Sequence, residues 1–388
     1  MTIKSVDRLI SPVLFLAGLV AYTSTLAPSV LDGDAALFQY TPHVLGVTYP
    51  TGYPVYLLLA KLWLTLFPFG SIAWRMNLFS ALCAGLALPI YYHLARRVWD
   101  NRLAGLTSVA IFATLPTFWL WATKTKIYTL NILLYLLVLW FVWPDNQTET
   151  TQSNLAAWLI KHRYKLGALA LGLQVGVHST TVLLIPGILW LLWLGLRPGE
   201  EQRRQKAEGS GEWGVESGWV GRWREMGRVL VVHSPYFLLP ALFYFYIPLR
   251  AEWLLAQYGR PGAIGRGLLA DFYHSGLAGW VRYFSAADFT GGVVTNWGNL
   301  PADLVAVYLP FLRDDFTLPG IIIGLVGGLT MLWQRRAYFG PSLLLYLLPI
   351  PFVLTYGQGE QRAFLLTSYL IFALFAGGLI VLISRLSS

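Results

Sequence analysis

An apolar run followed closely by two acids decides how this chain folds. Residues 10–26 read ISPVLFLAGLVAYTSTL, and residues 31–40 read LDGDAALFQY. The first stretch has the length of a helix that crosses a lipid bilayer. The second places Asp32 and Asp34 just beyond its end. Because acids at a membrane boundary are costly to keep, this is the first place to look for a functional site.

The composition extends this interpretation to the whole chain. Of 388 residues, 56% are hydrophobic and only 12% are charged, whereas soluble domains carry about a quarter charged residues. The recurring apolar runs are continuous rather than alternating, so they indicate membrane helices and not barrel strands. The net charge of +9 is divided among short clusters between the runs, which is typical of membrane topology, and no nucleic-acid partner is expected. The single cysteine, Cys83, excludes an intrachain disulfide.

The basic clusters predict the topology. Lys4 and Arg8 precede the first run, which is long and lacks a small-residue cleavage pattern, so we expect a retained helix. With ten crossings, every short basic cluster falls on one side, which is the cytoplasmic side, together with the N-terminus. We therefore expect an all-α polytopic protein of the cell (inner) membrane, with residues 1–388 forming a single bundle of about 10 transmembrane helices. The expected spans are residues 10–26, 73–95, 103–122, 127–143, 166–177, 180–196, 229–249, 320–333, 342–355 and 363–384.

Three longer connections are expected between these spans. Residues 27–72 form the first outer loop, and its apolar part Tyr53–Phe67 is short and contains Lys61, which favours an interfacial helix over a crossing. Residues 197–228 form a charged, tryptophan-containing cytoplasmic loop that either lies on the membrane surface or is a plain linker. Residues 251–318 form a second long outer loop, whose apolar part Leu304–Leu312 is expected to be another interfacial helix.

Charged and polar residues from separate outer segments can meet in one cavity under this topology. Acids mixed with cations at the membrane border suit a lipid-linked phosphate, which Lys and Arg would hold while a carboxylate serves as general base. Arg250 ends a span on the face where positive charge is disfavoured, so we expect it to contact a phosphate or an acid. The outer-face set is Asp32, Asp34, Lys124, Lys126, His178, Arg250, Arg282, Glu360 and Arg362.

These residues also have structural alternatives. Asp34 can cap the following helix, Asp32 can serve an Asp-Gly turn, and His178 can be a hydrogen-bonded turn residue. Lys126 can be a flanking residue whose amine reaches the interface, and Glu360 can simply pair with Arg362. No metal cluster at ligand spacing, phosphate-binding glycine loop or dinucleotide fingerprint occurs in the sequence. We expect no certain cofactor, and a divalent cation is allowed without being indicated.

Several motifs together resemble a known family. They are TLAP at 25–28, GDAALFQ at 33–39, LGVTYPTGYPVY at 45–56, WRMNL at 74–78, IYTLN at 127–131, GVHST at 176–180 and PLR at 248–250. In combination they resemble the protein O-mannosyltransferase-like family, long described as domain of unknown function 2723, which includes the transmembrane protein 260 relatives. That family belongs to the GT-C superfamily of membrane glycosyltransferases.

The resemblance implies a GT-C-like bundle with interfacial helices in the first outer loop. It implies transfer of a sugar from a polyprenyl-phosphate donor to a protein or glycan hydroxyl on the extracytoplasmic side. The family's catalytic or acceptor-orienting acid maps to Asp34, and we expect Asp32 beside it to contribute. Membrane lipids and other membrane subunits are further expected partners. Substrate contacts are expected from Tyr53, Lys126, His178, Arg250 and Arg362.

Three positions differ from the family pattern. Leu37 stands where a Glu is common, Tyr49 where a His is common, and Lys126 where a Glu is frequent. The loss of polar or acidic groups at one site motivates an alternative from a different class. In that alternative the chain is a catalytically inactive GT-C-like subunit that binds lipid or supports a larger membrane complex.

Overall fold

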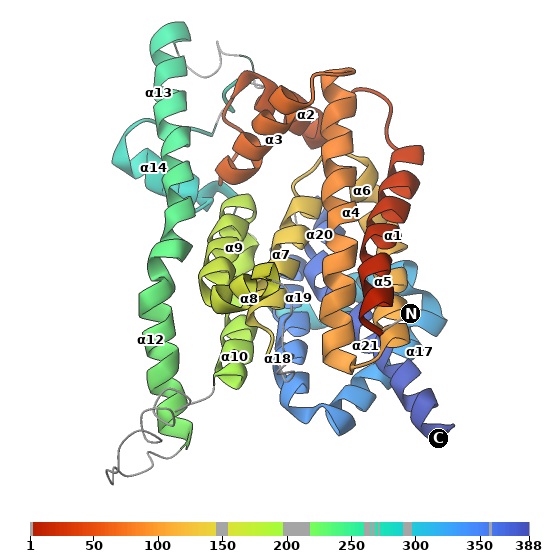
Figure 1. Ribbon diagram of the computed structural model, residues 1–388. Coiled ribbons are helices and arrows are strands. Elements are labelled where there is room, and N and C mark those ends of the chain that lie inside the picture. Colours follow the sequence, from red (N-terminus) through yellow and green to blue (C-terminus); the bar gives the residue numbers. More distant parts are fainter. Residues whose placement is uncertain are drawn as a thin grey trace.

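The described part of the chain is almost entirely helical. The computed structural model describes residues 3–144, 154–196, 218–259, 265, 268–270, 272–289, 297–356 and 359–387. In those ranges the β-structure is limited to one isolated bridge between Val47 and Leu269. Figure 1 shows the longer helices running roughly along one direction, with the short α2 and α3 at the end of the bundle away from the two termini. The expected all-α architecture is confirmed.

The first half begins with α1 (Ile3–Ser24) and α4 (Ile72–Trp99), which pack along each other. The close approach depends on Gly18, because a side chain there would run into Leu88. The expected third span is a bent pair, α5 (Arg102–Ala113) and α6 (Pro116–Thr123), with 65° between them. The break falls at Pro116, which cannot donate the backbone hydrogen bond that a continuous helix needs. Then α7 (Tyr128–Val142) follows.

The first outer loop carries α2 (Gly33–Val44) and α3 (Pro54–Leu66). A helix of 13 residues extends only about 20 Å, less than the hydrocarbon core of a bilayer. This length agrees with the expectation that the segment does not cross the membrane. Arg75 of α4 closes the end of α3 by donating from Nη1 to the carbonyls of Leu64 and Phe67, at 3.0 and 2.9 Å.

The second half adds a long helical rod and a C-terminal group. Residues 219–258 form one continuous helical stretch of 40 residues at the edge of the bundle (Figure 1). Its parts are α12 (Gly218–Leu238), η2 (Leu239–Phe245) and α13 (Tyr246–Tyr258). The other elements are α8 (Asn154–Lys161), α9 (Arg163–Val177), η1 (Ser179–Leu184), α10 (Ile185–Gly195), α14 (Gly276–Phe284), η4 (Ala287–Phe289), η5 (Trp297–Asn299), α16 (Leu300–Asp303), η6 (Leu304–Tyr308), α17 (Leu309–Gln334), α18 (Arg336–Leu347), α19 (Pro349–Tyr356), α20 (Gln361–Phe364) and α21 (Leu366–Leu386).

Two expected loops contain more helix than the sequence indicated. Residues 218–228 belong to α12, while residues 197–217 lie outside the described residues. Within the second outer loop, residues 251–258 continue α13, and residues 297–318 are helical up to and into α17. The long α17 is broken at Thr317, whose φ of 58° is non-helical, two residues before Pro319.

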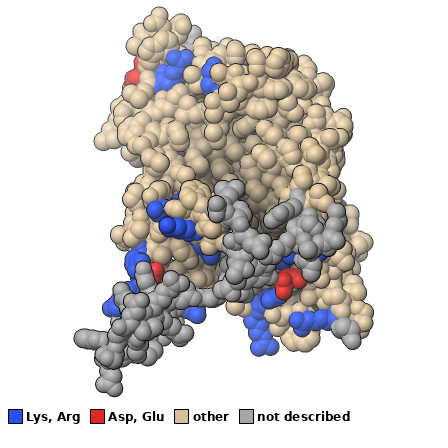
Figure 2. Space-filling view, in the orientation of Figure 1, with Lys and Arg blue, Asp and Glu red and all other residues tan. Residues whose placement is uncertain are grey.

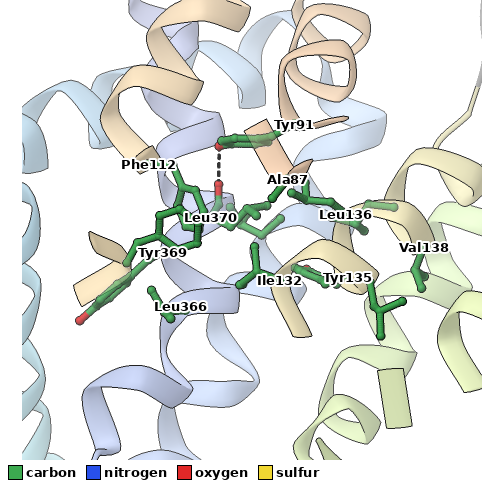
Figure 3. Packing of buried hydrophobic residues seen from close by; sticks show 14 of the residues in the cluster. Ala87, Tyr91, Phe112, Ile132, Tyr135, Leu136, Val138, Leu366, Tyr369 and Leu370 are labelled. Carbon is green, nitrogen blue, oxygen red and sulfur yellow. Dashed lines mark hydrogen bonds between the residues drawn. The ribbon is translucent and has the colours of Figure 1, made fainter. Parts of the chain in front are cut away.

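The centre of the bundle is apolar. Figure 3 shows Tyr91, Phe112, Ile132 and Tyr135 gathered around Leu370 of α21, a helix most of whose residues are buried. The Tyr91 hydroxyl donates to the carbonyl of Leu370 at 2.7 Å, so even this polar group is satisfied inside the core. A site made of polar and charged side chains is therefore expected at an end of the bundle and not in its centre.

The described residues include five helices long and apolar enough to cross a membrane, or six if the bent α5–α6 pair counts as one span. Four further apolar helices are shorter. On the face shown in Figure 2, a broad band without charged side chains lies between basic residues near both ends. The chain is a multi-pass membrane protein, and the exact number of spans stays a prediction.

Candidate active site

A cavity of about 480 Å³ lies where the first outer loop meets the starts of α7 and η1 and the turn before α20. The segments that form it come from the beginning, the middle and the end of the chain. Its lining residues are Asp34, Tyr49, Pro50, Tyr53, Lys126, Ile127, Tyr128, His178, Phe272, Tyr356, Gly359, Glu360 and Phe364. Its volume is that of a typical small-molecule site.

Asp34 stands in the first turn of α2 and faces this cavity. One carboxylate oxygen, Oδ2, accepts a hydrogen bond from the Tyr49 hydroxyl at 3.0 Å and one from Lys126 Nζ at 2.9 Å. The side chain is still 52% exposed. A carboxylate with open access is the arrangement that a general base requires.

Lys126 links this acid to a second one. Its side chain is 2% exposed, and its Nζ also contacts the carboxylate of Glu360 at 3.0 Å. The Tyr128 hydroxyl donates to Oε2 of Glu360 at 2.7 Å, and Nζ of Lys126 lies 3.0 Å from both oxygens of that carboxylate. The ring of Phe38 lies under the ammonium with its centroid 5.3 Å away. A cation this deeply buried is tolerable because two carboxylates and a ring face offset its lost hydration.

Tyrosines form the wall beside the two acids. Tyr49 and Tyr53 each pack edge-on against Phe38 and against each other. Burial raises the pKa of both phenols above the usual value, and the negative charge of Asp34 adds to the effect. Both hydroxyls therefore stay protonated at neutral pH and can donate hydrogen bonds. The His that the family often carries at position 49 is replaced here by a group that donates directly to Asp34.

His178 closes the inner side of the cavity at the junction of α9 and η1. It is 5% exposed, and its Nδ1 accepts from the backbone N–H of Thr180 at 3.3 Å. Burial, reinforced by the charge of Lys126, lowers the pKa of His178 to about 3. The ring is thus neutral at pH 7, with the proton on Nε2, because Nδ1 is the acceptor. Nε2 lacks a partner among the described residues and is free to donate to a ligand.

The structure brings Asp34, Tyr53, Lys126 and His178 together and leaves three expected residues outside the lining. Asp32 occupies the N-cap position of α2 and makes no capping hydrogen bond with its side chain. Arg250 donates from Nε and Nη2 to the carbonyls that end α2, those of Leu45 and Val44, at 2.7 and 3.1 Å. Its guanidinium stabilises the end of the helix that carries Asp34.

Arg362 is the third of these residues. Its Nε donates to the buried carboxylate of Asp315 at 2.8 Å, and that carboxylate also accepts from the backbone N–H and the hydroxyl of Thr117. The suggested Glu360–Arg362 pair is wrong, because Glu360 is engaged by Lys126 and Tyr128 instead. Arg362 anchors the turn that presents Glu360.

Sequence reasoning had named Glu360 only as an outer-face acid, and it passed over the roles of Tyr49, Tyr128, Phe272 and Tyr356. Tyr128 lies in the IYTLN motif, so its motif was a usable signal. The remaining residues stand in unremarkable aromatic or loop contexts, and their distance along the chain from Asp34 conceals the contact. In the ranges that the structure describes, no group of three or more His, Cys, Asp or Glu side chains could hold a metal ion.

The fold is that of the GT-C membrane glycosyltransferases. The described helices superpose on ArnT from Cupriavidus metallidurans bound to undecaprenyl phosphate with a TM-score of 0.53, at 16% sequence identity, covering 94% of this chain and 59% of that one. Residues 34–199 match the family model of the protein O-mannosyl-transferase TMEM260 N-terminal domain. This match covers the segment that carries most of the motifs, so the resemblance stated from the motifs is confirmed.

The chain is also similar in sequence to curated proteins. The protein O-mannosyl-transferase TMEM260 of Mus musculus is 31% identical over 193 residues, which are 49% of this chain and 26% of the mouse protein. An undecaprenyl phosphate-alpha-4-amino-4-deoxy-L-arabinose arabinosyl transferase of Pseudomonas fluorescens is 25% identical over 319 residues, 81% of this chain and 47% of that one. The chain thus spans between a quarter and a half of the length of these relatives.

Proposed function

We propose that this protein is a membrane glycosyltransferase. It transfers a sugar from a polyprenyl-phosphate donor to a hydroxyl of a protein or glycan acceptor. The observation that carries the proposal is the Asp34–Lys126–Glu360 cluster at the wall of an open cavity. The names of the relatives, which are sugar transferases, support the reaction class.

In the reaction, Asp34 takes the proton of the acceptor hydroxyl while the acceptor oxygen bonds to the anomeric carbon of the sugar. The bond between that carbon and the phosphate oxygen breaks, and the polyprenyl phosphate leaves with the electron pair. Lys126 stabilises the charge that grows on the leaving phosphate, which is the largest electrostatic demand of the step. The neutral ring of His178 donates a hydrogen bond from Nε2 to the bound donor. The tyrosines exclude water from the reacting atoms.

The cavity is proposed to open on the non-cytoplasmic side. It lies at the end of the bundle that holds α2 and α3, opposite both termini (Figure 1). The basic pair Arg96 and Arg97 ends α4 far from this site. Since Lys and Arg concentrate in cytoplasmic loops, this arrangement supports a position of the donor's headgroup on the outer side. The polyprenyl chain would then stay in the bilayer beside the cavity.

A second candidate function rests on one contact. Asp34 accepts two hydrogen bonds from this chain's own side chains, one of them from an ammonium. A chain with a permanently engaged acid could bind a lipid phosphate without transferring the sugar, as an inactive subunit of a larger complex. The two candidates differ in one measurable property, which is turnover.

The deciding experiment uses the purified chain in detergent with polyprenyl-phosphate sugars and acceptor peptides or glycans. Mass spectrometry measures the released polyprenyl phosphate. We expect Asp34→Asn to lower the rate at least about 100-fold, the contribution of a general base, while the protein still folds, with a loss of stability no larger than that of Glu360→Gln, which also removes one partner of Lys126. Asp32→Asn is the matched control, because Asp32 lies two residues away and outside the cavity lining. Full activity of Asp34→Asn rules out the mechanism, and lipid binding without turnover in the wild type favours the subunit.

A further inference from the structure

One buried side chain in the WRMNL motif ties together the parts of the chain that carry the cluster. Asn77 of α4 is fully buried and lies outside the cavity lining. Its Oδ1 accepts from Gln39 Nε2 at 3.0 Å, from the backbone N–H of Thr125 at 3.0 Å, and from the Thr125 hydroxyl. Its Nδ2 donates to the carbonyl of Ala27 at 2.7 Å. Nothing in the proposed chemistry uses this amide.

The partners of Asn77 lie next to the two charges of the site. Thr125 immediately precedes Lys126, so the bonds to its N–H and hydroxyl hold the chain from which the ammonium projects. Gln39 belongs to α2, the helix whose first turn carries Asp34. The same glutamine accepts from the N–H of Leu31 at 3.0 Å, which also fixes the approach to α2.

Only an amide satisfies this position in full. The carbonyl oxygen accepts and the NH₂ group donates at the same tip, and each of the partners of Asn77 needs one or the other. A carboxylate would keep the acceptor and lose the donor to Ala27. An apolar side chain of the same size would leave Gln39 and the Thr125 N–H without this partner, and unpaired buried polar groups drive local rearrangement.

We propose that Asn77 is a positioning residue that sets the distance between Asp34 and Lys126. The expected effect on the reaction rate rests on the proposed function. The expected effect on the position of Lys126 relative to Asp34 rests on the geometry alone. The ion pair spans 2.9 Å and joins segments 92 residues apart, which share no direct covalent constraint. Asn77 supplies the constraint through α2 on one side and Thr125 on the other. A displacement of about 1 Å at reacting groups costs roughly 100-fold in rate.

The test measures the exposure of Lys126 directly. In wild type the Lys126 side chain is 2% exposed and paired with two acids, so a water-soluble acylating reagent should modify it slowly. We expect Asn77→Leu to raise the labelling rate of Lys126 at least about 10-fold, read by peptide mass spectrometry, because the released loop frees the amine. Asn77→Asp keeps the bonds at Oδ and should give an intermediate rate.

Tyr91→Phe is the matched control. It removes one buried hydrogen bond from the same helix α4, to the carbonyl of Leu370, in the apolar core away from the cavity (Figure 3). We expect it to lower the thermal midpoint and to leave both Lys126 labelling and donor turnover unchanged. In Asn77→Leu we expect kcat to fall about 10- to 100-fold with a smaller change in the donor KM.

The outcomes separate the two claims. Equal Lys126 labelling in Asn77→Leu and Tyr91→Phe would overturn the positioning role. If Asn77→Leu does not fold, the labelling rate of Lys126 is measured in Asn77→Asp instead. A rate no faster than in Tyr91→Phe would likewise overturn the positioning role. A wild type without turnover refutes the proposed function alone, because labelling of Lys126 still reports whether Asn77 holds the pair.

Discussion

Replacing Lys126 by Met would leave Asp34 and Glu360 facing each other without a counter-charge. Met retains the apolar stem against Phe38 and removes the ammonium. Because each carboxylate lies within 3.0 Å of Nζ, their oxygens are at most about 6 Å apart, and two like charges at that distance repel by about 3 kcal/mol at an effective dielectric constant near 20. Asp34 is half exposed, so solvent screening reduces this repulsion to about 1–2 kcal/mol.

The assay is unfolding of the purified protein in detergent, followed by the fluorescence of its tryptophans. We expect Lys126→Met to lower the free energy of unfolding by about 2–3 kcal/mol, the sum of the repulsion and of the lost pairing. Adding Glu360→Gln to Lys126→Met should recover about 1–2 kcal/mol, since only one carboxylate then remains charged.

The double variant decides whether this reasoning is right. Glu360→Gln alone removes one partner of a buried ammonium, so it should destabilise the wild-type protein. The same substitution should stabilise the Lys126→Met variant, so its effect on the free energy of unfolding is opposite in the two proteins. A double variant no more stable than Lys126→Met would show that the two acids do not interact. Asp34, Lys126 and Glu360 would then not act as one charge cluster.

Two further predictions concern residues on either side of the cavity. Because burial lowers the pKa of His178 to about 3, below pH 6.5 the unfolded chain binds a proton that the folded chain does not. The free energy of unfolding of the wild type should therefore fall by about 1.4 kcal/mol per pH unit as the pH falls from 6.5 towards 3. His178→Asn should lack this component when unfolding is measured at pH 7.5 and 5. An identical pH dependence in both proteins would contradict the neutral ring. Arg250→Gln should lower the free energy of unfolding by about 1.5–3 kcal/mol, because the last carbonyls of α2 lose their hydrogen bonds. The KM for the donor should stay within about 2-fold of the wild-type value. A KM raised 10-fold would instead indicate that Arg250 binds the phosphate.

The amino-acid pattern alone was enough for the architecture and for one half of the site. Continuous apolar runs require helices in a membrane, because the backbone must satisfy its own hydrogen bonds there. The shortness of the stretch at 54–66 and its lysine predicted an interfacial helix, and the 13-residue length of α3 agrees with that prediction. The spacing between Asp34 and the Tyr-Pro turn behind it contributed to the family resemblance and indicated which end of the bundle to examine.

Tertiary structure decided which charges meet. Glu360 and Lys126 are 234 residues apart, and no local periodicity connects them. Arg250 and Arg362 have the composition of phosphate ligands, yet packing directs Arg250 to helix-end carbonyls and Arg362 to a buried acid. Helix formation depends on neighbours within a few residues, whereas an ion pair depends on where separate helices place their ends, and only the packed bundle determines that.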